Sequence, residues 1–405
     1  MLQNCRKNQN TAVIRLQNVF DNRPPPPLRG PVLARMSNPP KAPTADKPRS
    51  SAGGRSWDLV RWLPAQIATL DPGCFALVMA TGIISNAFFF ADVREPSDAL
   101  LLVNLVALPW LVLITIARAI WFRPELSADL VDPRRVFGFF TIIAGTDLFG
   151  AALALRGLPG LAIGLWLVAL GLWLLLIYFS FGVLIFLNTA RGANIVHGGW
   201  LNAIVATQSL VVLGTMIAPT LGGLEQTVFV LIHILWGVGL GLYGIFIALF
   251  AHRIFFADVE PDDITPLLWV VMGAAAISAN AGSTLILTDS GLPFLNAMRP
   301  FIEGMTLIVW AWATWWIPLL VVLGIWKHGI RRAPLTYTPM LWSLVFPLGM
   351  YALTTARLSL AADFAPLRQI ADAMMWIALV VWTATAAGLA VASWRSLRDG
   401  DRATA

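Results

Sequence analysis

The sequence has few side chains whose types and spacing suit covalent or metal chemistry. Its four histidines are His197, His233, His252 and His328, and no two of them have the spacing that places metal ligands on one helix face. The HExxH, GxSxG, P-loop and strand-linked GxGxxG patterns are absent from the sequence. We therefore predict no catalytic residue, no metal site and no cofactor, and we expect that the protein is not an enzyme.

Asp147 is the one acidic residue deep inside a long apolar run, residues 136–155. An ionisable group within a membrane span is costly, and it marks a candidate functional site. Two interpretations stay open. Asp147 either couples transport to protons as a protonatable group, or it is neutral or hydrogen-bonded to Thr or Asn on a neighbouring helix.

A second candidate is an aromatic residue beside a helix-breaking one. In the apolar stretch Trp342 to Gly349, Pro347 removes a helix hydrogen bond and kinks the chain, while Gly349 leaves space beside it. Phe346 can then turn into a central lumen, where an aromatic ring blocks passage sterically and by dewetting. The alternative is that Phe346 only packs against its neighbours.

Composition indicates which elements must position these residues. The chain has 405 residues, of which 58% are apolar and 12% charged, and its mean hydropathy is +0.72. Soluble domains have about 25% charged residues, so most of this chain must lie in lipid. This composition argues against nucleic-acid binders and cytosolic enzymes, and we predict no nucleic-acid partner. The net charge of +6 is more typical of membrane topology than of a polyanionic ligand.

Apolar runs long enough to cross a bilayer recur ten times, which predicts an all-α integral membrane protein. The predicted spans are 73–91, 99–121, 136–155, 160–187, 199–218, 227–251, 266–287, 301–326, 338–356 and 369–394. An even number of spans puts both termini on one side. That side holds 23 of the 28 Lys and Arg residues and the other side 5, so the positive-inside rule predicts cytoplasmic termini.

We divide the chain into three parts. Residues 1–65 are polar, basic and Pro-rich, with four prolines at 24–27, and are predicted to be a disordered cytoplasmic tail without a signal peptide. Met36 is a possible start of translation. Residues 66–395 form the membrane domain, and residues 396–405 are predicted to be a short cytoplasmic tail.

Polar side chains distinguish the odd-numbered spans from the even-numbered ones, which are richer in Leu, Val, Ile and Trp. Polar groups in hydrocarbon must face protein or water, so we expect the odd spans to form an inner ring around a pore and the even spans to face lipid. Residues 78–85 match 271–278 at four positions, either by chance or because helical hairpins repeat. The pore-lining candidates are Thr81, Ser85, Asn86, Thr146, Asp147, Thr207, Gln208, Ser278 and Asn280.

We predict no buried Arg or Lys in the odd spans, so selectivity is expected to come from pore width and from hydroxyl and amide groups. Arg299, Arg357 and Arg368 fall outside the predicted spans. They either draw anions to the outer mouth or are ordinary interfacial arginines. The tryptophans near Pro318 are interpreted mainly as lipid-contact and interface anchors.

Two segments, Asp71 to Gly82 and Trp342 to Gly349, make the chain resemble the tellurite-resistance/dicarboxylate transporter family, to which the plant slow-type anion channels also belong. The stretch 303–307 and the Trp-rich segment to His328 fit as well. The resemblance implies five helical hairpins around a quasi-fivefold axis, with odd helices lining a pore, in a homotrimer whose protomers each conduct. It also implies that Phe346 occludes the pore and that Ala76 lies where a small residue, often Gly, leaves room for the ring.

The resemblance implies transport of anions. We expect C4-dicarboxylates such as malate, or tellurite- and sulfite-type anions, to cross the cell membrane through the protomer, with protons as possible co-substrates. A passive channel for chloride or nitrate is the alternative. A membrane scaffold or enzyme without transport is a more remote one.

Overall fold

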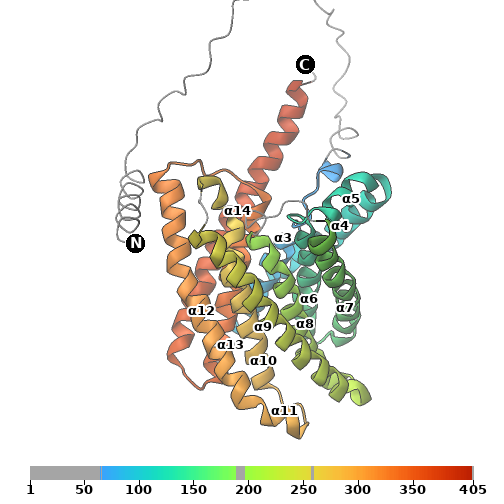
Figure 1. Cartoon of the computed structure of the whole chain (residues 1–405), viewed down its shortest axis with the longest axis vertical. Coiled ribbons are helices and arrows are strands. Elements are labelled where there is room, and N and C mark those ends of the chain that lie inside the picture. The colour runs from blue at the N-terminus through green and yellow to red at the C-terminus, as the bar shows by residue number, and fades with distance from the viewer. Residues whose placement is uncertain (1–63, 65, 188–196, 257–259, 404–405) are drawn as a thin grey trace, which may run out of the picture. The chain divides into compact units, whose positions relative to one another are not determined.

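The computed structural model describes residues 64, 66–187, 197–256 and 260–403. The predicted tail, including Met36, lies outside the described residues apart from residue 64. Within the described part the chain is helical and has no strand, which confirms the all-α prediction (Figure 1). The ten main helices are α3 (Ala76–Phe90), α4 (Arg94–Trp121), α6 (Phe140–Leu155), α7 (Pro159–Gly182), α8 (Asn202–Ile217), α9 (Glu225–Phe256), α10 (Val270–Leu287), α12 (Arg299–Ile325), α13 (Trp342–Ala361) and α14 (Pro366–Ala403).

These helices correspond one to one with the ten predicted spans. Nine helical segments among the described residues are long and apolar enough to cross a membrane, and α3 supplies the remaining span as a shorter helix. Short helices α5 (Arg123–Val131) and α11 (Pro293–Ala297) lie in the connections after α4 and before α12. Four inner helices are each preceded by a 3₁₀ turn, at Val136–Phe139, Gly198–Leu201, Pro266–Trp269 and Pro339–Leu341.

The odd-numbered spans form a closed inner ring, as predicted. Going around it, α3 packs against α6, α6 against α8, α8 against α10, α10 against α13, and α13 against α3 again. In the most apolar part of α6, α8, α10 and α13, 83 to 94% of the residues are buried. In the outer helices α4, α7, α9, α12 and α14 the share is only 17 to 33%, so these helices present most of their apolar surface to lipid.

Each inner helix pairs with the outer helix that follows it, which gives the five predicted hairpins, and each outer helix also touches the next inner helix. A tryptophan reinforces this second contact in four of the five repeats. The indole Nε1–H of an outer-helix Trp donates to an oxygen on the next inner helix, at 2.8 to 3.1 Å. The pairs are Trp173 to Thr207 Oγ1, Trp236 to the Ser278 carbonyl, Trp310 to Thr355 Oγ1 and Trp382 to Thr81 Oγ1.

This repeated bond corrects the interpretation of the Trp-rich segment in α12. Trp310 is half-buried and bonded to α13, and Trp316 is buried, so neither is simply a lipid or interface anchor. Trp312 and Trp315 are exposed and stack on each other, in keeping with lipid contact. In each of the four pairs, a hydroxyl or a backbone carbonyl of the inner helix satisfies an indole N–H that the outer helix cannot satisfy itself.

Candidate functional site

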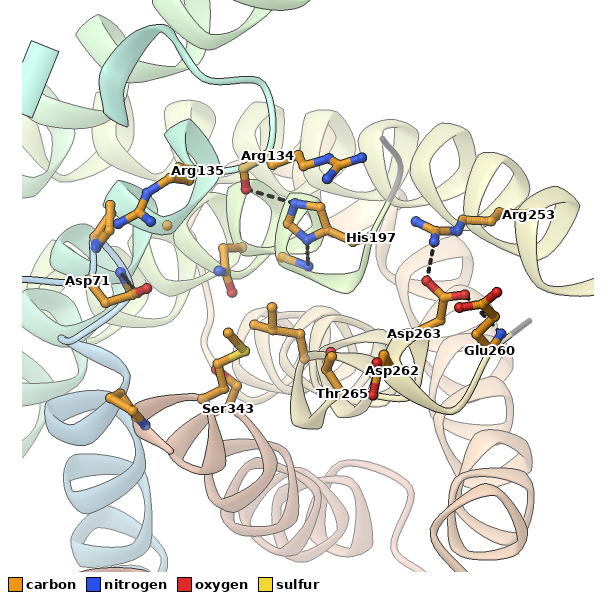
Figure 2. A pocket seen from close by; sticks show the side chains of 18 residues that line it. Asp71, Arg134, Arg135, His197, Arg253, Glu260, Asp262, Asp263, Thr265 and Ser343 are labelled. Atoms are coloured by element: carbon orange, nitrogen blue, oxygen red, sulfur yellow. Dashed lines mark hydrogen bonds and ion pairs between the residues drawn. The ribbon is translucent and has the colours of Figure 1, made fainter. Parts of the chain in front are cut away.

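A cavity of about 660 Å³ opens where the inner helices begin, and we call it the vestibule (Figure 2). All five inner helices contribute to it through their first turn or the residues just before it. Because the ring is closed below this cavity, the vestibule is the entrance to the ring from this end. Its lining residues are Asp71, Pro72, Gly73, Arg134, Arg135, Gly138, His197, Gly199, Asn202, Arg253, Glu260, Asp262, Asp263, Thr265, Leu267, Pro339, Met340 and Ser343.

Charged side chains of both signs line the vestibule. Figure 2 shows Arg134 and Arg135 with Asp71 on one side, and Glu260, Asp262 and Asp263 with Arg253 on the other. Arg253 Nη2 bonds to Asp263 Oδ1 at 2.6 Å, which fixes the loop that precedes α10 to the end of α9. The acidic residues offset the arginines, so net charge alone does not make this entrance attractive to anions.

His197 sits between these two sides in a fixed tautomer. Its Nδ1 accepts a hydrogen bond from the Gly199 N–H at 3.0 Å, so Nε2 carries the proton and donates to the Arg134 carbonyl at 2.7 Å. Burial lowers the pKa of His197 to about 4, although the Arg134 carbonyl partly opposes this effect. His197 is therefore neutral near pH 7 and acts as the N-cap of the turn that leads into α8.

One helical turn below the vestibule, the predicted gate residue is completely enclosed. Ser343 lines the vestibule, and Phe346, one turn further along α13, is 1% exposed. Gly273 of α10 lies against it: a Cβ at this position would be 3.4 Å from Cε1 of Phe346 and 2.8 Å from Cγ of Pro347. Ala76 is also buried, one turn beyond vestibule residue Gly73.

We call Ala76, Gly273 and Phe346 the Phe346 layer. Ala76 and Phe346 are among the predicted site residues, whereas Gly273 is not. The available signal was the run of small residues from Gly273 to Ala276, which allows two helices to approach closely.

Four of the predicted pore-lining residues bond to outer helices. Thr81 and Thr207 accept the tryptophan bonds described above, while Ser85 Oγ donates to the Ser97 carbonyl of α4 at 2.7 Å. Gln208 Nε2 donates to the Trp236 carbonyl of α9 at 3.2 Å. These contacts give all four side chains a part in joining the two rings of helices.

The other candidates bond within the inner ring or within their own helix. Asn86 Nδ2 donates to the Leu148 carbonyl of α6 at 3.0 Å. Thr146 and Ser278 each donate to a carbonyl four residues back, at 2.7 Å. Asn280 of α10 contacts Arg357 of α13, as described below.

Asp147 of α6 is buried and faces α8. Ser209 Oγ lies 2.7 Å from Asp147 Oδ2 and 2.8 Å from the Ala206 carbonyl, and both distances are in hydrogen-bond range. The other carboxyl oxygen, Oδ1, has no partner among the described residues. The carboxyl group thus has a hydroxyl partner on a neighbouring inner helix, close to the second of the two interpretations but with Ser in place of Thr or Asn.

Arg357 overturns the prediction that the inner helices contain no buried cation. Helix α13 continues to Ala361, past the predicted end of the span at residue 356, and Arg357 is only 6% exposed. The sequence becomes polar at Thr354, which suggested the end of the span. In the structure Thr354 and Thr355 donate to carbonyls within α13, so their hydroxyls stay buried at little cost.

Among the described residues, no group of three His, Cys, Asp or Glu side chains is close enough to hold a metal ion. The described residues form a closed ring of helices with a cavity at one end, a buried phenylalanine one turn further in and buried polar groups beyond it.

Residues 69–390, most of the chain, match the profile of the family described as SLAC1, voltage-dependent anion channel. The protein belongs to this family. The match confirms the resemblance inferred from the two sequence segments, and membership in the SLAC1 family supports anion transport across a membrane as the general function. A family of channels and transporters also fits the expectation of a non-enzyme.

Individual relatives are consistent with SLAC1 family membership. An uncharacterized transporter of Methanocaldococcus jannaschii is 24% identical over 79% of this chain and 92% of its own length. A second uncharacterized transporter of the same organism is 23% identical over 80% of this chain and 94% of its own length. An uncharacterized membrane protein of Mycobacterium tuberculosis is 40% identical over 34% of this chain and 70% of its own length.

Proposed function

We propose that anions cross the membrane through the centre of the inner ring and that Phe346 closes this path in the state seen here. The observation that carries the proposal is the position of the Phe346 ring, fully buried against Gly273 one turn below the vestibule. A buried aromatic ring in the path of an ion is a barrier, because the ion would have to lose its hydration to pass it. Pro347 supports the same proposal, since it frees the helix to bend next to the ring.

The orientation follows from the distribution of basic residues. With 23 of 28 Lys and Arg residues on the side of the termini, we place both termini in the cytoplasm and the protein in the cell membrane. The vestibule then opens to the cytoplasm, because the inner helices begin there.

For the substrate, we propose C4-dicarboxylates of the malate type or oxyanions of the tellurite and sulfite type. The resemblance in the segments 71–82 and 342–349 supports this class. A passive path for chloride or nitrate is the alternative. Proton coupling through Asp147 is less favoured, because its hydroxyl contact with Ser209 gives it a role in packing α6 against α8.

We also propose a homotrimer. Glycines on the outer helices α7 and α9 have no heavy atom within 4 Å of the position of a Cβ, so these faces can receive another helix closely. They are Gly160, Gly164 and Gly171 on α7, and Gly237, Gly241 and Gly244 on α9. Native mass spectrometry of the purified protein tests the trimer, and a monomer at all protein concentrations contradicts it.

Anion flux into proteoliposomes tests the proposed function and distinguishes the proposed substrates from the passive alternative and from proton coupling. Malate, sulfite, nitrate and chloride are supplied in turn, with and without a pH gradient. Flux of malate or sulfite without a gradient supports the proposal, and flux of chloride and nitrate alone supports the passive alternative. Flux that requires the gradient indicates proton coupling, while no flux of any anion, in wild type and Phe346→Ala alike, contradicts transport.

A further inference from the structure

Arg357 lies on the same face of α13 as the gate residue Phe346. Eleven residues separate them, which is about three turns of an α-helix, so the two side chains point within about 20° of each other. On α10, Gly273 and Asn280 are seven residues apart and also share a face, again within about 20°. Since Gly273 faces Phe346, Asn280 faces the same interior further from the vestibule.

The contacts of Arg357 agree with this geometry. Its Nη1 donates to Asn280 Oδ1 of α10 at 3.1 Å, and its guanidinium carbon lies 5.7 Å from the centre of the Phe90 ring of α3. Helices α10 and α3 are the two neighbours of α13 in the inner ring. A side chain that reaches both neighbours, from the face that holds the gate residue, lies on the inside of the ring.

This guanidinium lacks a counter-charge among the described residues. No carboxylate in the described part of the chain makes an ion pair with Arg357 within 4.0 Å, whereas Arg118, Arg135, Arg156, Arg253, Arg299 and Arg368 each have one. Arginine keeps its charge in proteins, and burying a charge without a partner is unfavourable. A site of this kind is stabilised when an anion enters it.

Asn280 has unused donors at the same place. Its amide nitrogen Nδ2 is completely buried and has no hydrogen-bond partner among the described residues, while its Oδ1 is occupied by Arg357. The Asn280 amide is therefore oriented by the arginine, with its N–H groups left over. The guanidinium of Arg357 and the amide nitrogen of Asn280 are thus buried donors on adjacent helices, and an acceptor that binds both would stabilise them.

We propose that Arg357 and Asn280 form a binding site for a small oxyanion at the end of the ring opposite the vestibule, with the planar guanidinium holding two oxygens of a carboxylate- or nitrate-like group. This geometry suits a guanidinium better than an ammonium, because two parallel N–H groups match two oxygens. The proposal rests on the proposed function, since the site lies on the proposed path through the ring, and it adds a buried cation to that path beyond Phe346.

Nitrate flux in proteoliposomes tests the site, in a Phe346→Ala background that opens the path. Arg357→Lys keeps the positive charge but loses the two parallel N–H groups of the guanidinium. We expect it to raise the half-saturating nitrate concentration about tenfold, with a smaller change for chloride. Asn280→Asp places a carboxylate against the guanidinium, and we expect it to weaken nitrate binding at least as much. Arg94→Lys is the matched control, because Arg94 is half-exposed and already paired with Asp92 at 2.7 Å.

A binding measurement separates failure of the site from failure of the path. Nitrate is titrated into purified full-length protein in detergent, without the Phe346 substitution, and the thermal unfolding midpoint is recorded. We expect nitrate to raise the midpoint of the wild type and of Arg94→Lys more than chloride does, and to have no such effect on Arg357→Lys or Asn280→Asp. If neither wild type nor Phe346→Ala gives flux but this pattern holds, the binding site is supported and the proposed path is contradicted. If nitrate acts equally on all four proteins, or equally to chloride, the site is contradicted even when flux is present.

Discussion

The ring of Phe346 on α13 packs directly against Gly273 on α10. With a side chain at residue 273, its Cβ would lie 2.8 Å from Cγ of Pro347 and 3.4 Å from Cε1 of Phe346. The missing side chain is therefore what allows Pro347 and the ring of Phe346 to approach α10. The aromatic side chain of Phe346 on α13 thus fits the space that Gly273 leaves on α10, one helical turn below the vestibule.

This pairing predicts a cost for adding one methyl group. Gly273→Ala forces Pro347 or α10 to move, and overpacking of this kind lowers the free energy of unfolding by about 1–3 kcal/mol. Thermal unfolding in detergent measures the effect. Gly304→Ala on α12 is the control, because nothing lies within 4 Å of its Cβ position and alanine favours helix. Equal unfolding midpoints for the two variants would show that the close approach at Gly273 is absent.

For Asp147 we expect the neutral isostere to be tolerated. The Ser209 hydroxyl has one hydrogen but lies within bonding distance of both Asp147 Oδ2 and the Ala206 carbonyl. An amide N–H at residue 147 can donate to Ser209 Oγ, which leaves the hydroxyl hydrogen for Ala206. Asp147→Asn should therefore change the free energy of unfolding by less than about 1 kcal/mol, and should leave the response of anion flux to a pH gradient unchanged.

Asp147→Leu is the comparison, because it leaves Ser209 without its side-chain partner. A loss of gradient-dependent flux in Asp147→Asn, with folding intact, would assign Asp147 to proton coupling instead of to packing.

The neutral His197 predicts a specific dependence of stability on pH. Its pKa is about 4 in the folded protein against an ordinary value of 6.5. Between these values the unfolded chain takes up a proton that the folded chain does not, so the contribution is constant above pH 6.5 and stability falls as the pH drops toward 4. His197→Asn keeps an N-cap acceptor for Gly199 but cannot titrate.

The unfolding midpoint of the wild type should thus fall more between pH 7 and pH 4.5 than that of His197→Asn. Parallel curves for the two proteins would contradict the burial and the hydrogen bonds described for His197.

The fold followed from simple patterns in the sequence. Ten apolar runs of sufficient length set the number of helices, and the contrast between polar odd spans and Leu-rich even spans separated inner from outer helices. The thickness of the bilayer fixes the length of each membrane-spanning helix, and the cost of exposing polar groups to lipid fixes which helices lie inside. The same patterns do not show which side chains are hydrogen-bond partners, so the tryptophan bonds between the outer and inner helices could not be predicted.

Only part of the candidate site could be predicted from the sequence. Phe346 and Pro347 became candidates because a proline inside an apolar run is visible in the sequence, whereas the contact with Gly273 required knowledge of which helix lies opposite. Arg357 was placed outside its span, because a polar stretch near a helix end looks like an interface. The hydrogen bonds from Thr354 to the Ala276 carbonyl and from Arg357 to Asn280 also join this part of α13 to α10, and neither partner can be read from the sequence.

The most direct test of the gate is the conductance of single purified proteins in a planar bilayer, comparing wild type with Phe346→Ala in symmetrical solutions of one anion. Removing the ring should raise the anion current at least tenfold, since the barrier is the loss of hydration beside an aromatic side chain. Leu344→Ala, a substitution on the partly buried flank of the same helix, should leave the current unchanged. Equal currents in wild type and Phe346→Ala, with both proteins folded, would contradict the account of Phe346 as the gate.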